Sequence, residues 1–221
     1  MKFKVDFSVI TPTYNSQDTI KKNLQSVFCQ NFKNYEQIIV DNKSDDNTIG
    51  IIKKFNNKKI NIISEKDEGL YDAINKGIGI AKGKYISILH SDDYFYNEDV
   101  LSDVVSKFNN PNLDIIYGNI IYVNKSYLPV RFWKSKKYKK GLFYYGWSPP
   151  HPGFFVRKEI YDKHGLYRQA LGNPADVELM YRMLELKDLQ NFYYDKIFVG
   201  MRIGGVSNRN IIGILKQNIT I

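Results

Sequence analysis

Apolar runs of strand length alternate with amphipathic segments of helix length through the first 90 residues of the chain. In chain order, the expected strands and helices cover residues 7–10, 18–30, 37–40, 45–55, 60–63, 69–81 and 85–89. Strands that alternate with helices in this way predict a mostly parallel sheet wrapped by helices. The fold class is therefore expected to be α/β.

Four short polar clusters follow the four expected strands, at residues 13–15, 41–45, 65–68 and 91–93. Ligands of open α/β sheets bind beyond the carboxyl ends of the strands, where these clusters should meet. Random placement would seldom put a polar cluster after each of four strands. We therefore expect a ligand site along this edge of the sheet.

The second half of the chain has a less regular pattern. Strands are expected over residues 115–123, 154–157 and 192–201, a helix over 175–186, and a loop over 131–141. We see no internal repeat and no low-complexity linker. A single domain over residues 1–221, with one continuous core, is the predicted organisation.

The formal net charge is +9, which indicates an anionic partner such as a phosphorylated ligand or an anionic membrane surface. No recognised nucleic-acid module is visible. The single cysteine, Cys29, lies in an apolar helical pattern and is expected in the core. Neither a signal peptide nor a run of membrane-spanning length is visible. We expect a cytoplasmic protein that can rest on the inner face of the cell membrane.

Asp92 and Asp93 form an adjacent acidic pair directly after an expected strand. A hard cation such as Mg²⁺ or Mn²⁺ would relieve the repulsion between two carboxylates and could bridge to diphosphate oxygens. The alternative is that the pair caps the following helix, which is expected to begin near Asn97.

Four segments in order resemble the family 2 glycosyltransferases, which have the GT-A fold. They are SVITPTYN at residues 8–15, IIVDNKSD at 38–45, DEGLYDAINKG at 67–77 and YISILHSDD at 85–93. The third resembles bacterial members that build surface polysaccharides. The resemblance covers nearly the whole chain and implies a nucleotide-sugar-binding half, about 1–110, and a smaller acceptor-binding half, about 111–221.

The resemblance implies roles for residues of the first half. Those expected to line the nucleotide base and ribose are Thr11, Pro12, Tyr14 and Asn15. Asp41 would accept a hydrogen bond from the base, and Asn42 stands where many relatives carry a second acid. Asp92 would contact the ribose or the donor sugar, and Asp93 would bind the metal. Ser91 replaces the first acid of the metal motif.

Lys76 and Asp72 are implied near the nucleotide or its phosphates. The alternative is an (i, i+4) surface pair on the expected helix. Residues 201–207 resemble the loop after the last strand, where Arg202 could contact phosphate as a charged fork, although an ordinary turn fits equally. His151 resembles the start of the acceptor-side strand, but a structural histidine is the alternative.

Asp176 and Glu178 stand at the start of the expected helix over 175–186. The family places its catalytic base in a short acidic motif at this point, so Asp176 is the first candidate and Glu178 the second. Such a base takes a proton from the acceptor hydroxyl as it attacks the anomeric carbon. The alternative is that these acids stabilise the amino terminus of the helix, by capping it or by interacting with the helix dipole.

The resemblance implies an inverting, metal-dependent glycosyltransferase that uses Mn²⁺ or Mg²⁺. The donor is expected to be a UDP-sugar, and the acceptor a glycan or lipid-linked glycan of bacterial polysaccharide, O-antigen or capsule assembly. A sugar-nucleotide pyrophosphorylase would need a Gly-rich phosphate loop after the first strand, where this chain has TPTYN. A non-catalytic module that binds nucleotide sugar or lipid-linked glycan is the second alternative. The lysine-rich run over residues 134–140 could meet anionic lipid or remain a solvated loop.

Overall fold

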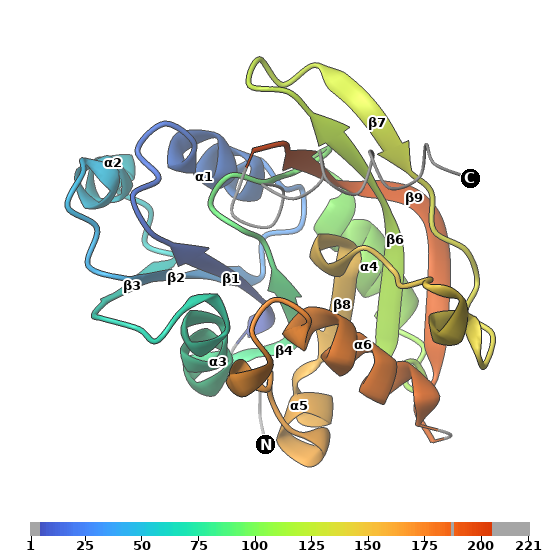
Figure 1. The fold of residues 1–221 in the computed structure, drawn as a ribbon. Helices are drawn as coiled ribbons and strands as arrows, with labels where there is room; N and C mark the ends of the chain where they lie inside the picture. The colour runs from blue at the N-terminus through green and yellow to red at the C-terminus, as the bar shows by residue number, and fades with distance from the viewer. Residues whose placement is uncertain (1–4, 187, 205–221) are drawn as a thin grey trace, which may run out of the picture.

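The computed structural model describes residues 5–186 and 188–204, and a mixed sheet runs through both halves of the chain (Figure 1). Its strands are β1 (Val5–Thr13), β2 (Tyr35–Asp41), β3 (Ile60–Ser64), β4 (Gly83–Ile88), β5 (Tyr94–Phe95), β6 (Ile115–Val123), β7 (Pro129–Trp133), β8 (Phe154–Arg157) and β9 (Asn191–Arg202). The spatial order is β3-β2-β1-β4-β8-β6-β9-β5, and β7 pairs with β6. The α/β class is confirmed.

The first four strands are parallel, as the strand–helix alternation predicts. β1 lies between β2 and β4, and β3 extends the sheet beyond β2. Beyond β4 the sheet becomes mixed, because β8 runs antiparallel to both β4 and β6, whereas β9 runs parallel to β6. The carboxyl ends of β1, β2 and β4 therefore meet at one edge.

Helices cover both faces of the sheet (Figure 1). They are α1 (Ile20–Phe28), α2 (Thr48–Phe55), α3 (Leu70–Ile80), α4 (Val100–Phe108), α5 (Lys158–His164) and α6 (Ala175–Glu185). Buried side chains of α3, α5 and α6 pack in one apolar cluster, and those of α1, α2 and α4 contribute to two others. The first of these clusters joins residues from both halves of the chain.

Gly77 lets α3 approach the sheet closely. A Cβ at this position would lie 2.4 Å from Ile10 Cγ2 on β1 and 3.4 Å from Val40 Cγ2 on β2. Since both partners are fully buried core side chains, neither has room to move away. The amino end of α3 is thereby held beside the strand ends that carry the polar clusters.

Two predictions about local structure are wrong. Strand β7 occupies the first residues of the expected loop over 131–141, because it pairs with β6 as the second strand of a hairpin. Cys29 is exposed, since the chain leaves α1 at this residue. The helix α5 was not assigned from the sequence, and α4, which was expected to begin near Asn97, begins at Val100. Residues 205–207 of the predicted glycine loop lie outside the described residues.

Within the part of the chain that the structure describes, no helix is both long enough and apolar enough to cross a membrane.

Candidate active site

A cleft of about 490 Å³ opens at the carboxyl ends of β1, β2 and β4. All four predicted polar clusters contribute to its wall, which confirms that they meet at this edge. The predicted site residues that line the cleft are Pro12, Tyr14, Asn15, Asn42, Ser91, Asp92, Asp93 and Arg202. A second hollow, of about 640 Å³, lies at residues 110–114, Asp188 and Gln190, next to the amino ends of β6 and β9. None of the predicted site residues lines it.

The loop after β1 presents Tyr14 and Asn15 to the cleft. Asn15 has a positive φ of 45°, a left-handed conformation that asparagine tolerates better than most residues. Its N–H donates to Ser44 Oγ at 2.9 Å, and its Oδ1 accepts from the Asp45 N–H at 3.1 Å. The loops after β1 and β2 are therefore tied together, which leaves the Tyr14 side chain 57% exposed at the cleft.

Thr11 and Asp41 are fully buried and do not line the cleft. Thr11 Oγ1 accepts a hydrogen bond from Gln37 Nε2 at 3.1 Å. The Asp41 carboxylate accepts from the Ser44 N–H at 3.1 Å, from Ser64 Oγ at 2.7 Å and from the Ser44 hydroxyl. Asp41 thus organises the loop after β2, and its contact with a base stays a prediction.

Asn42 lies in the cleft wall, and its Oδ1 accepts from the Asp67 N–H at 3.0 Å. Asp67 is also part of this wall, and its Oδ1 accepts from the Gly69 N–H at 2.9 Å. Burial raises the pKa of Asp67. The polar clusters after β2 and β3 are therefore joined directly, so this end of the cleft is built from two loops that brace each other.

The acidic loop after β4 is held by a buried asparagine of α1. Asn23 Nδ2 donates to the His90 carbonyl at 2.8 Å and to the Asp93 carbonyl at 3.1 Å. Its Oδ1 accepts a hydrogen bond from Gln37 Nε2 at 2.8 Å. The Asp93 carboxylate is 2% exposed and accepts from the Arg202 N–H at 3.1 Å. Because α4 begins only at Val100, the acidic pair does not cap it.

Burial raises the pKa of Asp93, and the neighbouring charge of Asp92 raises it further. A bound cation would offset both effects, because it favours the ionised form of the carboxylates. No group of three or more histidine, cysteine or acidic residues gathers as metal ligands among residues 5–186 and 188–204. The donor set still fits Mg²⁺ or Mn²⁺, because such ions are commonly bound by one or two carboxylates together with substrate phosphates and water.

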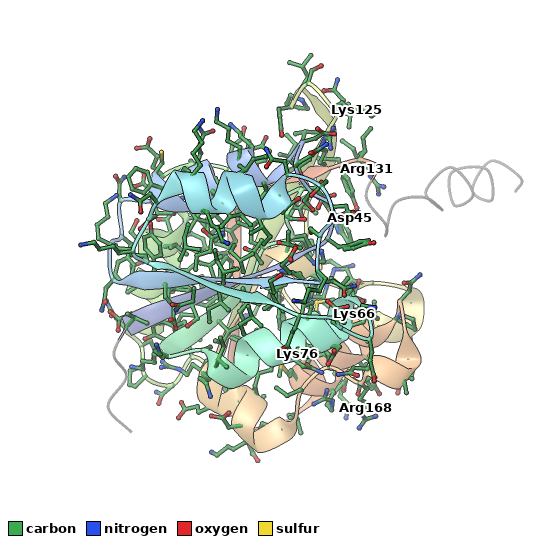
Figure 2. All side chains as sticks on the ribbon, turned by 90° about the vertical axis from the view of Figure 1, so that its left-hand side faces the viewer. Asp45, Lys66, Lys76, Lys125, Arg131 and Arg168 are labelled. Atoms are coloured by element: carbon green, nitrogen blue, oxygen red, sulfur yellow. The ribbon has the colours of Figure 1, made fainter. Side chains whose placement is uncertain are left out.

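Asp72 and Lys76 lie on α3 outside the cleft and form the (i, i+4) pair, with 3.1 Å between Lys76 Nζ and the carboxylate. Lys76 also pairs with Glu65 at 3.0 Å and donates to the Lys66 carbonyl at 3.0 Å, and Figure 2 labels both lysines beside α3. Asp72 accepts from the Glu68 N–H at 3.0 Å. The surface-pair interpretation is confirmed, and any contact with nucleotide stays a prediction.

Asp176 stands in the first turn of α6 and is not among the residues that line the cleft, whereas His90 is. Burial lowers the pKa of His90, and the charges of Asp92 and Asp176 oppose this shift. The Asp176 charge also acts on His151 and, together with burial, raises the pKa of Tyr71. The first candidate base is thus brought close to the acidic loop from a distant part of the chain.

His151 is buried and does not line the cleft. Its Nε2 is hydrogen-bonded to the Tyr167 hydroxyl at 2.7 Å, and its ring packs edge-on against His90 with 5.8 Å between centroids. Burial lowers the pKa of His151 to about 4. The structure therefore places His151 behind His90 as a support, as the structural alternative predicts.

Glu178 is committed to ion pairs away from the cleft. Its carboxylate accepts from Arg182 Nε at 2.9 Å and Nη2 at 3.2 Å, and Arg168 lies 3.3 Å away. Arg182 in turn donates to the carbonyls of residues 164–166. Glu178 is therefore disfavoured as the second candidate base, because its carboxylate holds the turn after α5.

Residues 8–165 match the family described as Glycosyl transferase family 2, which is more than half of the chain. The chain belongs to this family. It is a glycosyltransferase that takes its sugar from a nucleotide-sugar. A relative named PGL/p-HBAD biosynthesis glycosyltransferase, from Mycobacterium tuberculosis, is 27% identical over 208 residues and covers 91% of this chain and 79% of its own length.

A second relative of this family 2 chain is UDP-Glc:alpha-D-GlcNAc-diphosphoundecaprenol beta-1,3-glucosyltransferase WfgD of Escherichia coli. It is 29% identical over 131 residues, covering 59% of this chain and 51% of WfgD. Among solved structures, S. aureus TarS in complex with UDP-GlcNAc gives a TM-score of 0.73 at 24% identity, covering 92% of this chain and 60% of TarS. The mannosyltransferase PcManGT of Pyrobaculum calidifontis, in complex with GDP-Man and Mn²⁺, gives a TM-score of 0.70 at 15% identity. This match covers 93% of this chain and 59% of PcManGT. The fold of this glycosyltransferase is the GT-A type.

Several cleft residues of this glycosyltransferase were missed by the sequence reasoning. His90 comes two residues after the end of β4, and its place directly after the expected apolar strand over residues 85–89 was the signal. Ser16 Oγ lies 2.8 Å from Ser91 Oγ and joins the loops after β1 and β4. The other missed residues that line the cleft are Asp18, Thr19, Gly69, Leu70 and Ala73. Thr13, Met201 and Gly204 also line it and belong to the polar cluster 13–15 and to the loop after the last strand, both of which were predicted.

Proposed function

We propose that this glycosyltransferase catalyses inverting, metal-dependent transfer of a sugar from a UDP-sugar to an acceptor hydroxyl. The observation that carries the proposal is that Asp93 lines the cleft while Asp176, from the other half of the chain, acts electrostatically on His90 in the cleft wall. One carboxylate is proposed to serve the donor diphosphate, and the other the acceptor.

The nucleotide is proposed to lie at the end of the cleft formed by the loops after β1, β2 and β3. Tyr14 offers an exposed aromatic face for the base, and Asn42 and Asp67 offer polar groups beside it. UDP-GlcNAc bound to TarS, a protein of the same fold, supports a UDP-sugar donor. Because the Asp41 carboxylate is hydrogen-bonded to Ser44 in the loop after β2 and to Ser64 at the end of β3, a contact with the base would be made by a carboxylate already fixed in place.

Asp93, assisted by Asp92, would hold Mn²⁺ or Mg²⁺. When bound, such an ion neutralises charge that develops on the leaving diphosphate. Manganese in the PcManGT complex supports this assignment. Arg202 lies in the same wall, and its backbone N–H donates to Asp93 Oδ1, so its guanidinium is proposed to attract the diphosphate.

Asp176 is proposed as the general base. It takes the proton of the acceptor hydroxyl while the oxygen bonds to the anomeric carbon and the bond to UDP breaks. A single displacement of this kind inverts the anomeric configuration and needs no covalent sugar intermediate. His90 lines the cleft and is acted on by the charges of both Asp92 and Asp176, so it is proposed to line the position of the reacting sugar.

The acceptor is proposed to be a glycan or lipid-linked glycan of bacterial surface-polysaccharide assembly. The name of WfgD, whose acceptor is a diphosphoundecaprenol-linked sugar, supports a lipid-linked acceptor. The acceptor would enter from the side of α6, where Asp176 stands, since the loops after β1 to β3 occupy the other side of the cleft.

The proposal is tested by incubating the full chain with UDP-sugars and Mn²⁺, with and without an acceptor, and measuring UDP release. Turnover that stops when the metal is chelated is expected. Binding of UDP-sugar in a thermal-shift assay without any turnover would instead identify the non-catalytic binding module.

A further inference from the structure

The loop over residues 134–147, here called the Lys-Tyr loop, is fixed to the sheet by hydrogen bonds. The Tyr117 hydroxyl donates to the Lys136 carbonyl at 3.1 Å and accepts from the Tyr138 N–H at 2.7 Å. The Ser135 N–H donates to Asn119 Oδ1 at 2.8 Å. Since Tyr117 and Asn119 are buried on β6, the loop is anchored rather than loosely attached.

Aromatic packing holds the remainder of the Lys-Tyr loop against α6. The ring of Phe143 packs edge-on against Tyr181 of α6 at 5.3 Å and against Trp147 at 5.5 Å. This packing leaves Tyr144 79% exposed and Tyr145 89% exposed. Two neighbouring aromatic side chains therefore project into solvent from a supported turn, although burial of each would be favourable.

Four exposed lysines flank the two tyrosines. No acidic side chain of the described residues lies within salt-bridge distance of any of them, whereas the nearby Lys134 pairs with Asp195 at 3.2 Å. The Lys-Tyr loop thus exposes both cationic and aromatic side chains, which are Lys136, Lys137, Lys139, Lys140, Tyr144 and Tyr145.

The Lys-Tyr loop lies close to the proposed acceptor side. Phe143 contacts Tyr181, which follows Asp176 by five residues in α6. At the rise of an α-helix, this spacing is about 7.5 Å along the axis. The Lys-Tyr loop therefore packs against the helix that carries the candidate base.

We propose that the Lys-Tyr loop docks this protein on an anionic membrane surface. Tyrosine is favoured at the boundary between lipid headgroups and hydrocarbon, where its ring is buried and its hydroxyl stays hydrated. Lysines beside it are attracted by anionic headgroups, each by about fivefold in the binding constant. Docking through this surface would bring a membrane-held acceptor near α6, the helix that carries Asp176.

The test is co-sedimentation of the full chain with vesicles of phosphatidylcholine alone or with added phosphatidylglycerol, without donor or acceptor. The test variant replaces Lys136, Lys137, Lys139 and Lys140 with glutamine. The matched control replaces Lys21, Lys53, Lys54 and Lys58, which are exposed on α1, α2 and the turn that follows, and so removes the same charge elsewhere. A third variant is Tyr144→Ser with Tyr145→Ser.

The parent and the matched control should bind vesicles that contain phosphatidylglycerol and should be released by salt. The test variant should bind more than about 100-fold more weakly, since four lysines are lost, and the tyrosine variant should also bind more weakly. Equal losses in the two lysine variants would show that net charge alone is responsible and would overturn the proposal, as would failure of the parent to bind. Because binding is measured without catalysis, these outcomes are independent of the proposed function.

Discussion

Asp176→Asn is expected to abolish turnover while leaving the protein folded. The substitution preserves size but cannot accept the acceptor proton, and a general base contributes about 10²–10⁴-fold to the rate. The cost to stability should be small, because an acid in the first turn of a helix stabilises by only about 0.3–1 kcal/mol. In a domain of this size, that corresponds to about 1–4 °C in Tm.

Glu178→Gln provides the matched control, because it is expected to lower stability while leaving turnover nearly unchanged. The Glu178 carboxylate forms a two-pronged pair with Arg182, and the two side chains are only 19% and 16% exposed. Loss of hydrogen bonds between charged groups costs about 1.5–3 kcal/mol, or about 3–10 °C in Tm. Turnover at a temperature where this variant remains folded should be close to that of the parent.

The two variants are compared by UDP release at saturating donor and Mn²⁺, by Kd for the UDP-sugar and by thermal melting. Asp176→Asn should bind donor nearly as tightly as the parent. If Glu178→Gln is inactive and Asp176→Asn is active, the base has been assigned to the wrong residue. If Asp176→Asn melts far below the parent, Asp176 serves the helix terminus instead.

Three further outcomes are expected. Asp93→Asn should lose both metal-dependent transfer and the rise in Tm that Mn²⁺ gives with UDP, and wild-type activity would refute its role as a ligand. Asp41→Ala should raise the Kd for UDP about tenfold or more and also lower the Tm, since three hydrogen bonds are lost; an unchanged Kd would exclude the base contact. Because burial lowers the pKa of His151 from 6.5 to about 4, its contribution to stability is full above about pH 6.5 and falls towards pH 4, by about 3 kcal/mol. The Tm of His151→Gln should therefore fall less than the Tm of the parent between about pH 6.5 and pH 4. An equal fall in Tm in the two proteins would contradict the assignment.

The first half of the fold could be predicted from the sequence because its information is local. A buried strand is a short apolar run, and an amphipathic helix has an apolar stripe, so residues 7–89 reveal their strand–helix order without knowledge of any partner. A parallel sheet then brings the strand ends together, and polar side chains at those ends must share one edge. The cleft and the Asp92–Asp93 loop followed from this reasoning.

The strands of the second half depended on contacts that the sequence does not display. β7 is short and exposed along most of its length, and only its pairing with β6 makes it a strand. For the same reason, the sheet beyond β4 is mixed, since the direction of β8 is set by its two neighbours rather than by its own residues.

Among the site residues, the sequence supplied the chemical groups and the tertiary structure assigned their partners. Asp176 and Glu178 are two residues apart on one helix, so they must point about 200° apart, but only the packing of α6 decides which carboxylate acts on His90 and which binds Arg182. Likewise, the sequence does not reveal that the Asp41 carboxylate is hydrogen-bonded to Ser44 and Ser64, and only the folded structure shows these partners. The role of a carboxylate cannot be deduced from the sequence alone, because it depends on charges and hydrogen-bond donors that only folding brings near it.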